Sequence, residues 1–267
     1  MAAVDEFFDR TVDTYDAHYD APTAPGYALR SRLNVVLDLL GNGPGEILDA
    51  GMGPGRLCAE LADRGWTVSG VDVSEEMVAR ARERLPEARD RLLAAPVEQL
   101  PFRDASFDAV TVTGALEYVH DLPRGLRELV RVLRPGGRGV LSFPNSRAFY
   151  ALWYTRLYYP TVRALRRVLP IGGASRPTGW RGPFGRRYFE GYVHAAGFEI
   201  AELRHASYLV VPSPLDLAVP AAAARLAAAV ETRANALGNA LATQLVYAVR
   251  KTTGSASTSA STSDAAL

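Results

Sequence analysis

Short apolar segments alternate with segments of helical periodicity through the middle of the chain, and this alternation constrains the fold more than any other feature. The apolar segments have the length of buried strands, and the intervening segments have the spacing of amphipathic helices. The expected strands are Glu46–Ala50, Trp66–Val71, Phe107–Thr113 and Arg138–Phe143, and the expected helices are Arg56–Asp63, Glu75–Arg84 and Arg124–Leu133. Strands that alternate with helices form right-handed crossovers around a parallel sheet, so an α/β, doubly wound fold is predicted.

The flanking segments are expected to complete a single domain over residues 1–251. Its N-terminal part, residues 1–40, is predicted to be helical from Thr11 to Leu40 with an interruption at Pro22–Gly26, and its α/β core spans 41–143. An insert over 144–184 separates this core from the C-terminal part of the sheet, residues 185–251. The elements expected there are a helix at 185–196, a strand at Phe198–Leu203, a helix at Ala218–Leu241 and an antiparallel last strand at Thr243–Val249. Pro135–Gly137 reads as a turn, and residues 252–267, rich in Ser, Thr and Ala, are expected to be disordered.

Composition limits the classes of protein to consider. The chain has 267 residues, of which 48% are hydrophobic, so it can bury a sizeable core. Its net charge of +1 provides no general attraction for nucleic acid, and none is expected as a partner. Cys58 is the single cysteine, which excludes an internal disulfide and a thiolate metal cluster. The acidic N-terminus lacks the pattern of a signal peptide, so a cytoplasmic setting is expected, with no metal and an undetermined oligomeric state.

A glycine-rich turn follows the first expected strand. Asp49 is followed by Gly51, Gly53 and Gly55, and glycines at alternate positions let the backbone turn sharply and approach a ligand. Asp72 ends the second expected strand, where a carboxylate can accept hydrogen bonds from both hydroxyls of a ribose. The alternative interpretation of Asp72 is a loop acid or a helix cap, for which Ser74 is the better candidate.

In order, these motifs resemble the class I methyltransferases, the Rossmann-like family that binds S-adenosylmethionine, over about Asn34–Asn145. The resemblance implies that Asp49 and the three glycines line the methionine part of the cofactor and that Asp72 holds the ribose. It also implies that Val73 and Met77 flank the adenine, that Val97 and Glu98 belong to the adenine loop, and that Thr113 lies where the methyl group emerges. Many relatives carry an aspartate in the adenine loop where this chain has Pro96, so that contact is lost or supplied by another group.

The acceptor is expected to be a small molecule, with oxygen the favoured atom, such as a natural product, a quinone or a lipid-like compound. A hydroxyl or amine acceptor must lose a proton, and His120, which follows the third expected strand, is the preferred base. The alternative for His120 is a solvated loop histidine. Tyr15 and Tyr19 resemble an N-terminal lid that binds substrate, and ordinary packing of two rings spaced four apart explains them equally well.

The segment Arg147–Arg187 is rich in arginine and aromatic residues and contains no acidic residue. Helical spacing places Val162, Leu165, Val168 and Leu169 on one stripe. One interpretation is a helical lid packed on the sheet with solvated arginines. A more specific interpretation is a substrate cover in which Trp153 and Tyr158 contact the acceptor. A third interpretation is that the segment contacts a membrane surface.

Two functions of other classes remain open at this point. One is a regulatory protein that binds S-adenosylmethionine without catalysis. The other is an NAD-dependent dehydrogenase, which the alternate spacing of the glycines disfavours, because pyrophosphate binding favours Gly-x-Gly-x-x-Gly.

Overall fold

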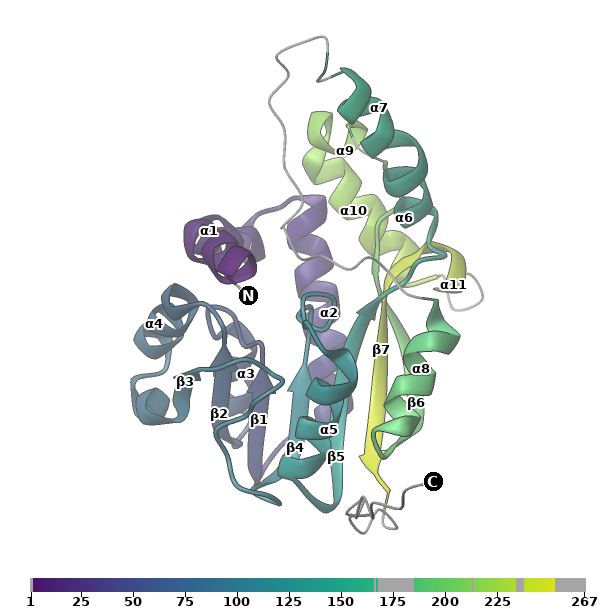
Figure 1. Ribbon diagram of the computed structural model, residues 1–267. Coiled ribbons are helices and arrows are strands. Elements are labelled where there is room, and N and C mark those ends of the chain that lie inside the picture. The colour runs from purple at the N-terminus through teal and green to yellow at the C-terminus, as the bar shows by residue number, and fades with distance from the viewer. Residues whose placement is uncertain (1, 166, 168–184, 213, 234–237, 253–267) are drawn as a thin grey trace, which may run out of the picture.

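The computed structural model describes residues 2–165, 167, 185–212, 214–233 and 238–252. Its centre is a seven-stranded sheet in the order β3-β2-β1-β4-β5-β7-β6 (Figure 1). The strands are β1 (Glu46–Ala50), β2 (Thr67–Asp72), β3 (Leu92–Ala94), β4 (Phe107–Val112), β5 (Leu133–Pro144), β6 (Phe198–Tyr208) and β7 (Ala242–Lys251). Strand β7 pairs antiparallel with both of its neighbours, and the other pairings are parallel. The predicted fold class, with its antiparallel last strand, is therefore confirmed.

Helices cover both faces of the sheet, and each face has its own apolar core. On one face lie α2 (Ala24–Leu40), α3 (Arg56–Asp63) and α4 (Glu75–Arg84), where Leu40, Leu61 and Ala81 are buried. On the other face lie α5 (Leu122–Val132) and α8 (Arg186–Ala195), where Leu129 and Phe189 are buried. This arrangement leaves the carboxyl ends of β1, β2 and β4 together at one edge of the sheet.

Three strand predictions need correction. The short edge strand β3 was not expected, and it follows a 3₁₀ helix, η1 (Pro86–Arg91). Strand β5 begins at Leu133, so Pro135–Gly137 lies within the strand instead of forming a separate turn. Its pairing with β4 changes register between Phe107 and Ala109. Pro135–Gly137 therefore form an irregular part of β5 opposite this point. Strand β6 continues beyond Leu203 because its long pairing with β7 extends to Tyr208.

The N-terminal segment forms two helices that meet near the expected interruption. Helix α1 (Ala2–Asp20) begins well before the predicted Thr11, whereas α2 starts after Thr23, whose hydroxyl accepts a hydrogen bond from the N–H of Gly26. Helix α1 crosses above the carboxyl edge of the sheet (Figure 1). It packs on α2 and α4 and thereby adds a wall to that edge.

The segments after β5 are more broken than expected. The described part of the insert comprises α6 (Phe149–Trp153), the π-helix η2 (Tyr154–Tyr158) and α7 (Tyr159–Leu165). The single helix predicted over Ala218–Leu241 is wrong, because α9 (Leu215–Ala218) and α10 (Pro220–Glu231) are separated at Val219. Proline at the start of α10 cannot continue a preceding helix, and it suits a first turn. A further short helix, α11 (Gly238–Leu241), precedes β7.

Several predictions fall outside the described residues. Val168 and Leu169 of the apolar stripe, the insert from residue 168 to 184 and the tail from 253 to 267 belong to this group. Thr252, the first residue of the expected tail, is described, and its backbone N–H and its hydroxyl both donate to the carbonyl of Gly197 at 3.0 Å. It therefore belongs to the end of the sheet.

Candidate active site

The glycine turn connects β1 to α3 at the carboxyl edge. Gly51, Gly53 and Gly55 have φ values of +78°, +53° and +76°, which residues with a side chain rarely adopt. A Cβ on Gly51 would lie 2.4 Å from the Cβ of Ala115, so the loop after β4 also requires a glycine there. A Cβ on Gly53 would be in van der Waals contact with the ring of Tyr15 on α1, 3.9 Å away.

Asp72 connects this turn to the end of β2. Its Oδ2 accepts a hydrogen bond from the N–H of Gly53 at 2.8 Å, and its Oδ1 accepts from the N–H of Ser74 at 3.0 Å. Burial raises the pKa of Asp72, and these backbone hydrogen bonds oppose the rise without cancelling it. Each carboxylate oxygen has a second lone pair, so Asp72 keeps acceptor capacity on the side that faces the pocket.

Asp49 lies beneath the turn and is 1% exposed. Its Oδ2 accepts a weak hydrogen bond from the thiol of Cys58 at 3.5 Å, while its Oδ1 has no hydrogen-bond partner among the described residues. Burial raises the pKa of Asp49 to about 7, with the Cys58 hydrogen bond opposing the rise and the charge of Asp72 adding to it. Cys58 is fully buried beside it and packs as a small core residue.

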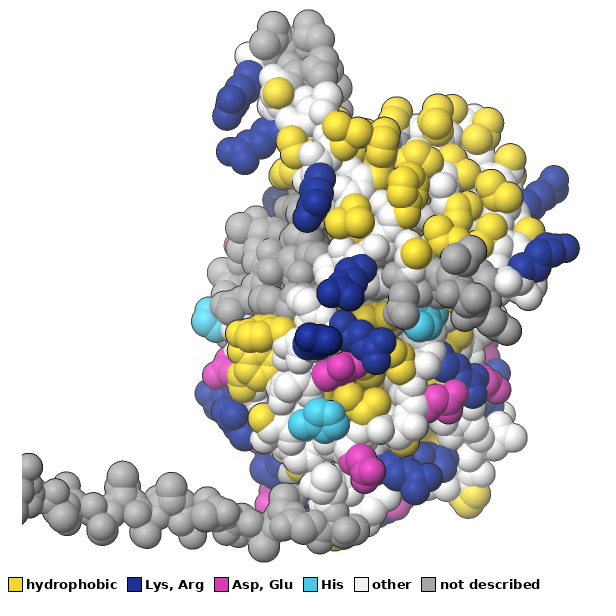
Figure 2. Space-filling model, turned by 90° about the vertical axis from the view of Figure 1, so that its right-hand side faces the viewer, with side chains coloured by type: hydrophobic (Ala, Val, Ile, Leu, Met, Phe, Trp, Pro, Cys, Tyr) yellow, Lys and Arg dark blue, Asp and Glu magenta, His cyan; other side chains and the backbone are white. Residues whose placement is uncertain are grey.

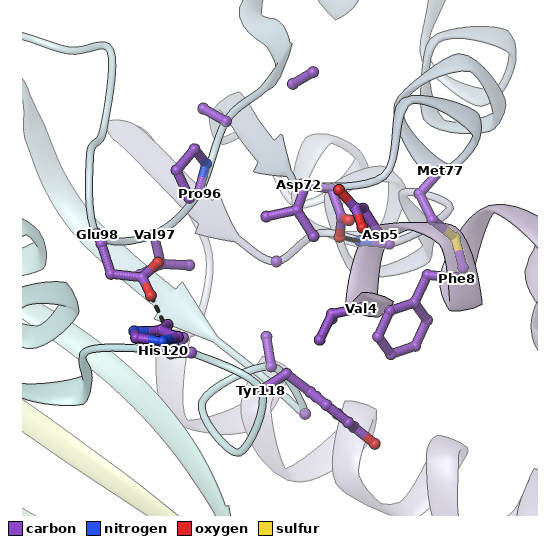
Figure 3. A pocket seen from close by; sticks show the side chains of 18 of the residues that line it. Val4, Asp5, Phe8, Asp72, Met77, Pro96, Val97, Glu98, Tyr118 and His120 are labelled. Atoms are coloured by element: carbon purple, nitrogen blue, oxygen red, sulfur yellow. Dashed lines mark hydrogen bonds between the residues drawn. The ribbon is translucent and has the colours of Figure 1, made fainter. Parts of the chain in front are cut away.

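A pocket of about 490 Å³ opens over the turn, between the sheet edge and α1 (Figure 3). Its volume lies in the range of about 300 to 1,000 Å³ that is typical of small-molecule sites. Ten of the residues singled out in the sequence analysis line it: Tyr15, Gly51, Gly53, Asp72, Val73, Met77, Val97, Glu98, Thr113 and His120. Pro96 lines it as well, so the position where many relatives carry an aspartate is here an apolar part of the wall.

The loop after β4 forms the opposite wall of the pocket. Glu98 holds this loop, since its Oε1 accepts hydrogen bonds from the backbone N–H groups of His120 at 2.6 Å and Asp121 at 3.2 Å. The ring of Tyr118 meets the ring of Phe8 on α1 edge to face, with centroids 5.2 Å apart. Two aromatic side chains from distant parts of the sequence therefore close one side of the cavity.

Helix α1 is attached over the pocket by an acidic stripe, defined here as Asp9, Asp13, Asp16 and Asp20. Their spacing places these residues on one face of the helix. The Ser74 hydroxyl donates to Asp9 at 2.5 Å, and Arg80 pairs with Asp13 at 2.5 Å. Asp16 pairs with both Arg56 and Arg84 at 2.7 Å, and Arg56 reaches Asp20 at 2.5 Å. The helix that carries Tyr15 and Phe8 is thus fixed to α3 and α4, which lie beside the glycine turn.

Not every predicted site residue lines the pocket. Asp49 and Gly55 support the turn from behind, and Gly55 begins α3 in a left-handed conformation. Tyr19 packs against Tyr15 with centroids 6.0 Å apart and lies under the guanidinium of Arg56. Trp153 and Tyr158 lie on α6 and η2, outside the residues that line the pocket. Their assignment as substrate-binding residues stays a prediction.

Two buried charged residues behind the pocket, Arg32 and Glu117, were missed by the sequence analysis. Arg32 is 8% exposed and Glu117 is 7% exposed, and the Oε2 of Glu117 has no hydrogen-bond partner among the described residues. A Cβ on Gly114 would lie 2.6 Å from Nη1 of Arg32, so this guanidinium packs directly behind the pocket loop. Burial lowers the pKa of Arg32, but the electrostatic effect of the facing Tyr15, Tyr19 and Glu117 is larger, so the pKa is raised overall. Because Arg32 and Glu117 are far apart in sequence, no local pattern indicates that both are buried behind the same loop.

Comparison with known proteins agrees with this geometry. Residues 48–141 match the family model described as a methyltransferase domain. A ubiquinone/menaquinone biosynthesis C-methyltransferase (UbiE) of Geobacter sulfurreducens is 37% identical over 158 residues, which cover 55% of this chain and 59% of the relative. A malonyl-[acyl-carrier protein] O-methyltransferase of Pseudescherichia vulneris is 35% identical over 136 residues, 51% of each chain. The chain thus spans between half and two thirds of the length of these relatives.

Among solved structures, a protein of Thermotoga maritima named a SAM-dependent methyltransferase, possible histamine N-methyltransferase, has the same fold. Its TM-score is 0.60 at 21% identity, and the match covers 92% of this chain and 99% of that one. The names of these three proteins specify carbon, oxygen and nitrogen as acceptor atoms, so similarity leaves the acceptor atom open. The glycine turn and the acid that ends β2 lie in one Rossmann-like unit, and residues 48–141 of this unit match the methyltransferase-domain family.

Proposed function

We propose that this chain is an enzyme that transfers the methyl group of S-adenosylmethionine to a small, largely apolar acceptor with an ionisable hydroxyl. The observation that carries the proposal is that Asp72, the glycine turn and the His120 loop line the same pocket. The first two suit a cofactor, and the third places a titratable side chain at the same cavity.

The described residues fit the cofactor by their chemistry. Asp72 has acceptor capacity for ribose hydroxyls, and Val73, Met77 and Val97 provide an apolar slot for the adenine ring. The unpartnered Oδ1 of Asp49 lies beneath the turn, where the ammonium of the methionine part would neutralise it. Arg32 is positioned to balance the methionine carboxylate from behind Gly114. When bound, the cofactor supplies an electrophilic methyl group on a sulfonium.

The remaining walls favour an apolar acceptor. Val4 and Phe8 from α1, together with Tyr118 and Val119 from the loop after β4, contribute rings and aliphatic groups (Figure 3). Such walls exclude water and orient a ring or a chain, which positions the acceptor atom for in-line attack. This lining is compatible with the quinone-related acceptors in the names of the UbiE relatives.

His120 is the residue that we assign to proton removal. It is an exposed side chain at the mouth of the pocket, on a loop that Glu98 fixes through two backbone hydrogen bonds. Removing the proton from a ring hydroxyl raises the electron density on that oxygen and on the adjacent ring carbon. One base therefore serves methylation of either atom, and acceptor placement decides which of the two is methylated.

The test is a turnover assay with S-adenosylmethionine and a panel of hydroxylated aromatic and quinol acceptors. We expect S-adenosylhomocysteine release to match the appearance of a singly methylated product, whose methyl position nuclear magnetic resonance assigns to oxygen or carbon. The matched control is the same ring without its hydroxyl, which should be inert. Tight cofactor binding without turnover on any acceptor would indicate a regulatory binding protein, and absent cofactor binding would refute the site assignment.

A further inference from the structure

Exposed hydrophobic side chains are concentrated on one region of the described surface, the helices after β5 and after β6. Eight large hydrophobic residues are exposed in the described part of the chain, and all except Tyr188 lie on this region. We call it the apolar face and define it by Phe149, Leu152 and Leu157 on α6 and η2, and by Leu215, Leu217, Val219 and Leu226 on α9, α10 and their junction. Leu217 is 69% exposed and Leu215 is 60% exposed, and large exposed apolar patches mark interaction surfaces, whereas single exposed leucines do not.

The two groups of helices that form the apolar face are in contact. The hydroxyl of Tyr150 on α6 donates to the carboxylate of Asp216 on α9 at 3.5 Å, and α11 also packs on α6. Figure 2 shows the result as hydrophobic side chains spread over the upper part of the molecule. The face is therefore one continuous surface built from two separate stretches of the chain.

Arginines surround this face, and its acidic residues are turned inward. Arg147, Arg156, Arg163, Arg167, Arg225 and Arg233 are all exposed on the same segments. None of them takes part in an ion pair found among the described residues. The acids of these helices are Asp216, which is 4% exposed, and Glu231, whose oxygens accept from Tyr27 at 2.6 Å and from Ser31 at 2.5 Å.

This combination points to one partner. We infer that the apolar face docks on a lipid bilayer that contains anionic headgroups, with leucine and phenylalanine side chains in the interface and arginines on the phosphates. Interfacial binding scales with buried apolar area and with attraction to anionic lipid, and the face provides both. A second copy of the chain would bring arginines against arginines at the rim, because the described rim exposes no acidic side chain.

The face lies at the same end of the sheet as the pocket and α1 (Figure 1). A docked molecule would therefore turn its pocket end toward the bilayer. Among the described residues no helix is long and apolar enough to cross a membrane, so the contact would be made with the surface.

The experiment is co-sedimentation of the purified chain with vesicles, without cofactor or acceptor, so that its failure is distinct from failure of the proposed function. We expect binding to phosphatidylcholine vesicles that contain phosphatidylglycerol, at least tenfold weaker binding to pure phosphatidylcholine, and weakening by salt. L215E/L217E and R156Q/R163Q should each weaken binding at least tenfold. R89Q/R103Q removes the same charge from exposed positions elsewhere and should bind as the parent does.

Circular dichroism and melting curves establish that each variant folds, which is expected because the substituted side chains are exposed. Absent binding by the parent chain would overturn the inference, as would equal loss in R89Q/R103Q, which would indicate attraction by overall charge. Sedimentation velocity of the same samples tests whether a second copy of the chain covers the apolar face instead. A dimer that L215E/L217E dissociates would show that a second copy of the chain covers the face, and the membrane assignment would be wrong.

Discussion

The carboxylate of Asp72 accepts a hydrogen bond from the N–H of Gly53 at 2.8 Å, so the end of β2 is fastened to the glycine turn that follows β1. One side chain thereby shapes the turn and faces the pocket. Substitution at this position tests both roles.

Replacing Asp72 by alanine should weaken S-adenosylhomocysteine binding at least tenfold. The variant loses charge-assisted hydrogen bonds, each of about 1.5 to 3 kcal/mol, to the ligand and to the turn. Isothermal titration calorimetry measures the affinity, and Glu76→Ala is the control, because Glu76 is exposed on α4 outside the pocket lining. Unchanged affinity in Asp72→Ala would contradict the ribose assignment.

Asp49 should make cofactor binding pH-dependent near neutrality. Its pKa in the folded protein is about 7, so below this pH the buried carboxyl is protonated and cannot pair with an ammonium group. Affinity for S-adenosylhomocysteine should therefore rise as pH increases through 7. The stability of the unliganded protein should change with pH in the opposite direction, because the Asp49 carboxyl binds its proton more tightly in the folded state than in the unfolded chain. The free energy of unfolding should fall between pH 3.8 and about 7.

Asp49→Asn is the variant that isolates this effect, since the amide is similar in size and does not titrate in this range. Its binding curve should be flat across pH 6 to 8, within about a factor of two, and weaker than that of the parent at the upper end. A pH dependence that persists in Asp49→Asn would assign the titration to another group.

Asp16 should be the main attachment point of α1. Burial opposes its ionisation, but hydrogen bonds from Arg56 and Arg84 outweigh this and hold its pKa below the ordinary value. Asp16→Asn should lower the free energy of unfolding by about 1.5 to 3 kcal/mol. It should also weaken cofactor binding, because α1 is then held less tightly over the pocket. Asp13→Asn is the control, because the Asp13 carboxylate is 81% exposed and its pair should contribute less than about 1 kcal/mol.

The pH dependence of this attachment follows from the lowered pKa. The stabilisation from Asp16 is complete above the ordinary aspartate value of 3.8 and is lost as pH falls through the lower folded value. Melting curves at acidic pH should show this loss in the parent and not in Asp16→Asn. Equal pH profiles in the two proteins would place the acid-sensitive contact elsewhere.

His120→Gln should lower kcat about a hundredfold or more while cofactor affinity stays unchanged, as expected for loss of general base catalysis. The rate of the variant should depend on pH only through ionisation of the acceptor itself. His194→Gln is the matched control, since His194 is exposed on α8 and does not line the pocket. A pH–rate profile that keeps its parental shape in His120→Gln would exclude His120 as the base.

The sequence by itself determined the parallel core and most of the residues that form the pocket wall beside the glycine turn. Strand-length apolar runs predicted β1, β2 and β4, and the alternate glycines with Asp72 placed the ligand turn, because these features depend on local backbone preference and on the order of the elements. The pocket-lining positions Val73, Met77, Val97 and Thr113 followed from the resemblance.

Only the tertiary structure decided what surrounds that wall. The acidic stripe of α1 meets arginines of α3 and α4 across more than thirty residues of chain, and Arg32 lies beside Gly114 and Glu117 although no local pattern connects them. The exposure of Leu215 and Leu217 is likewise invisible in the sequence, because leucine is a residue type that is most often buried. Local periodicity reports which side chains share a face of an element, whereas the packing of distant elements decides what that face meets.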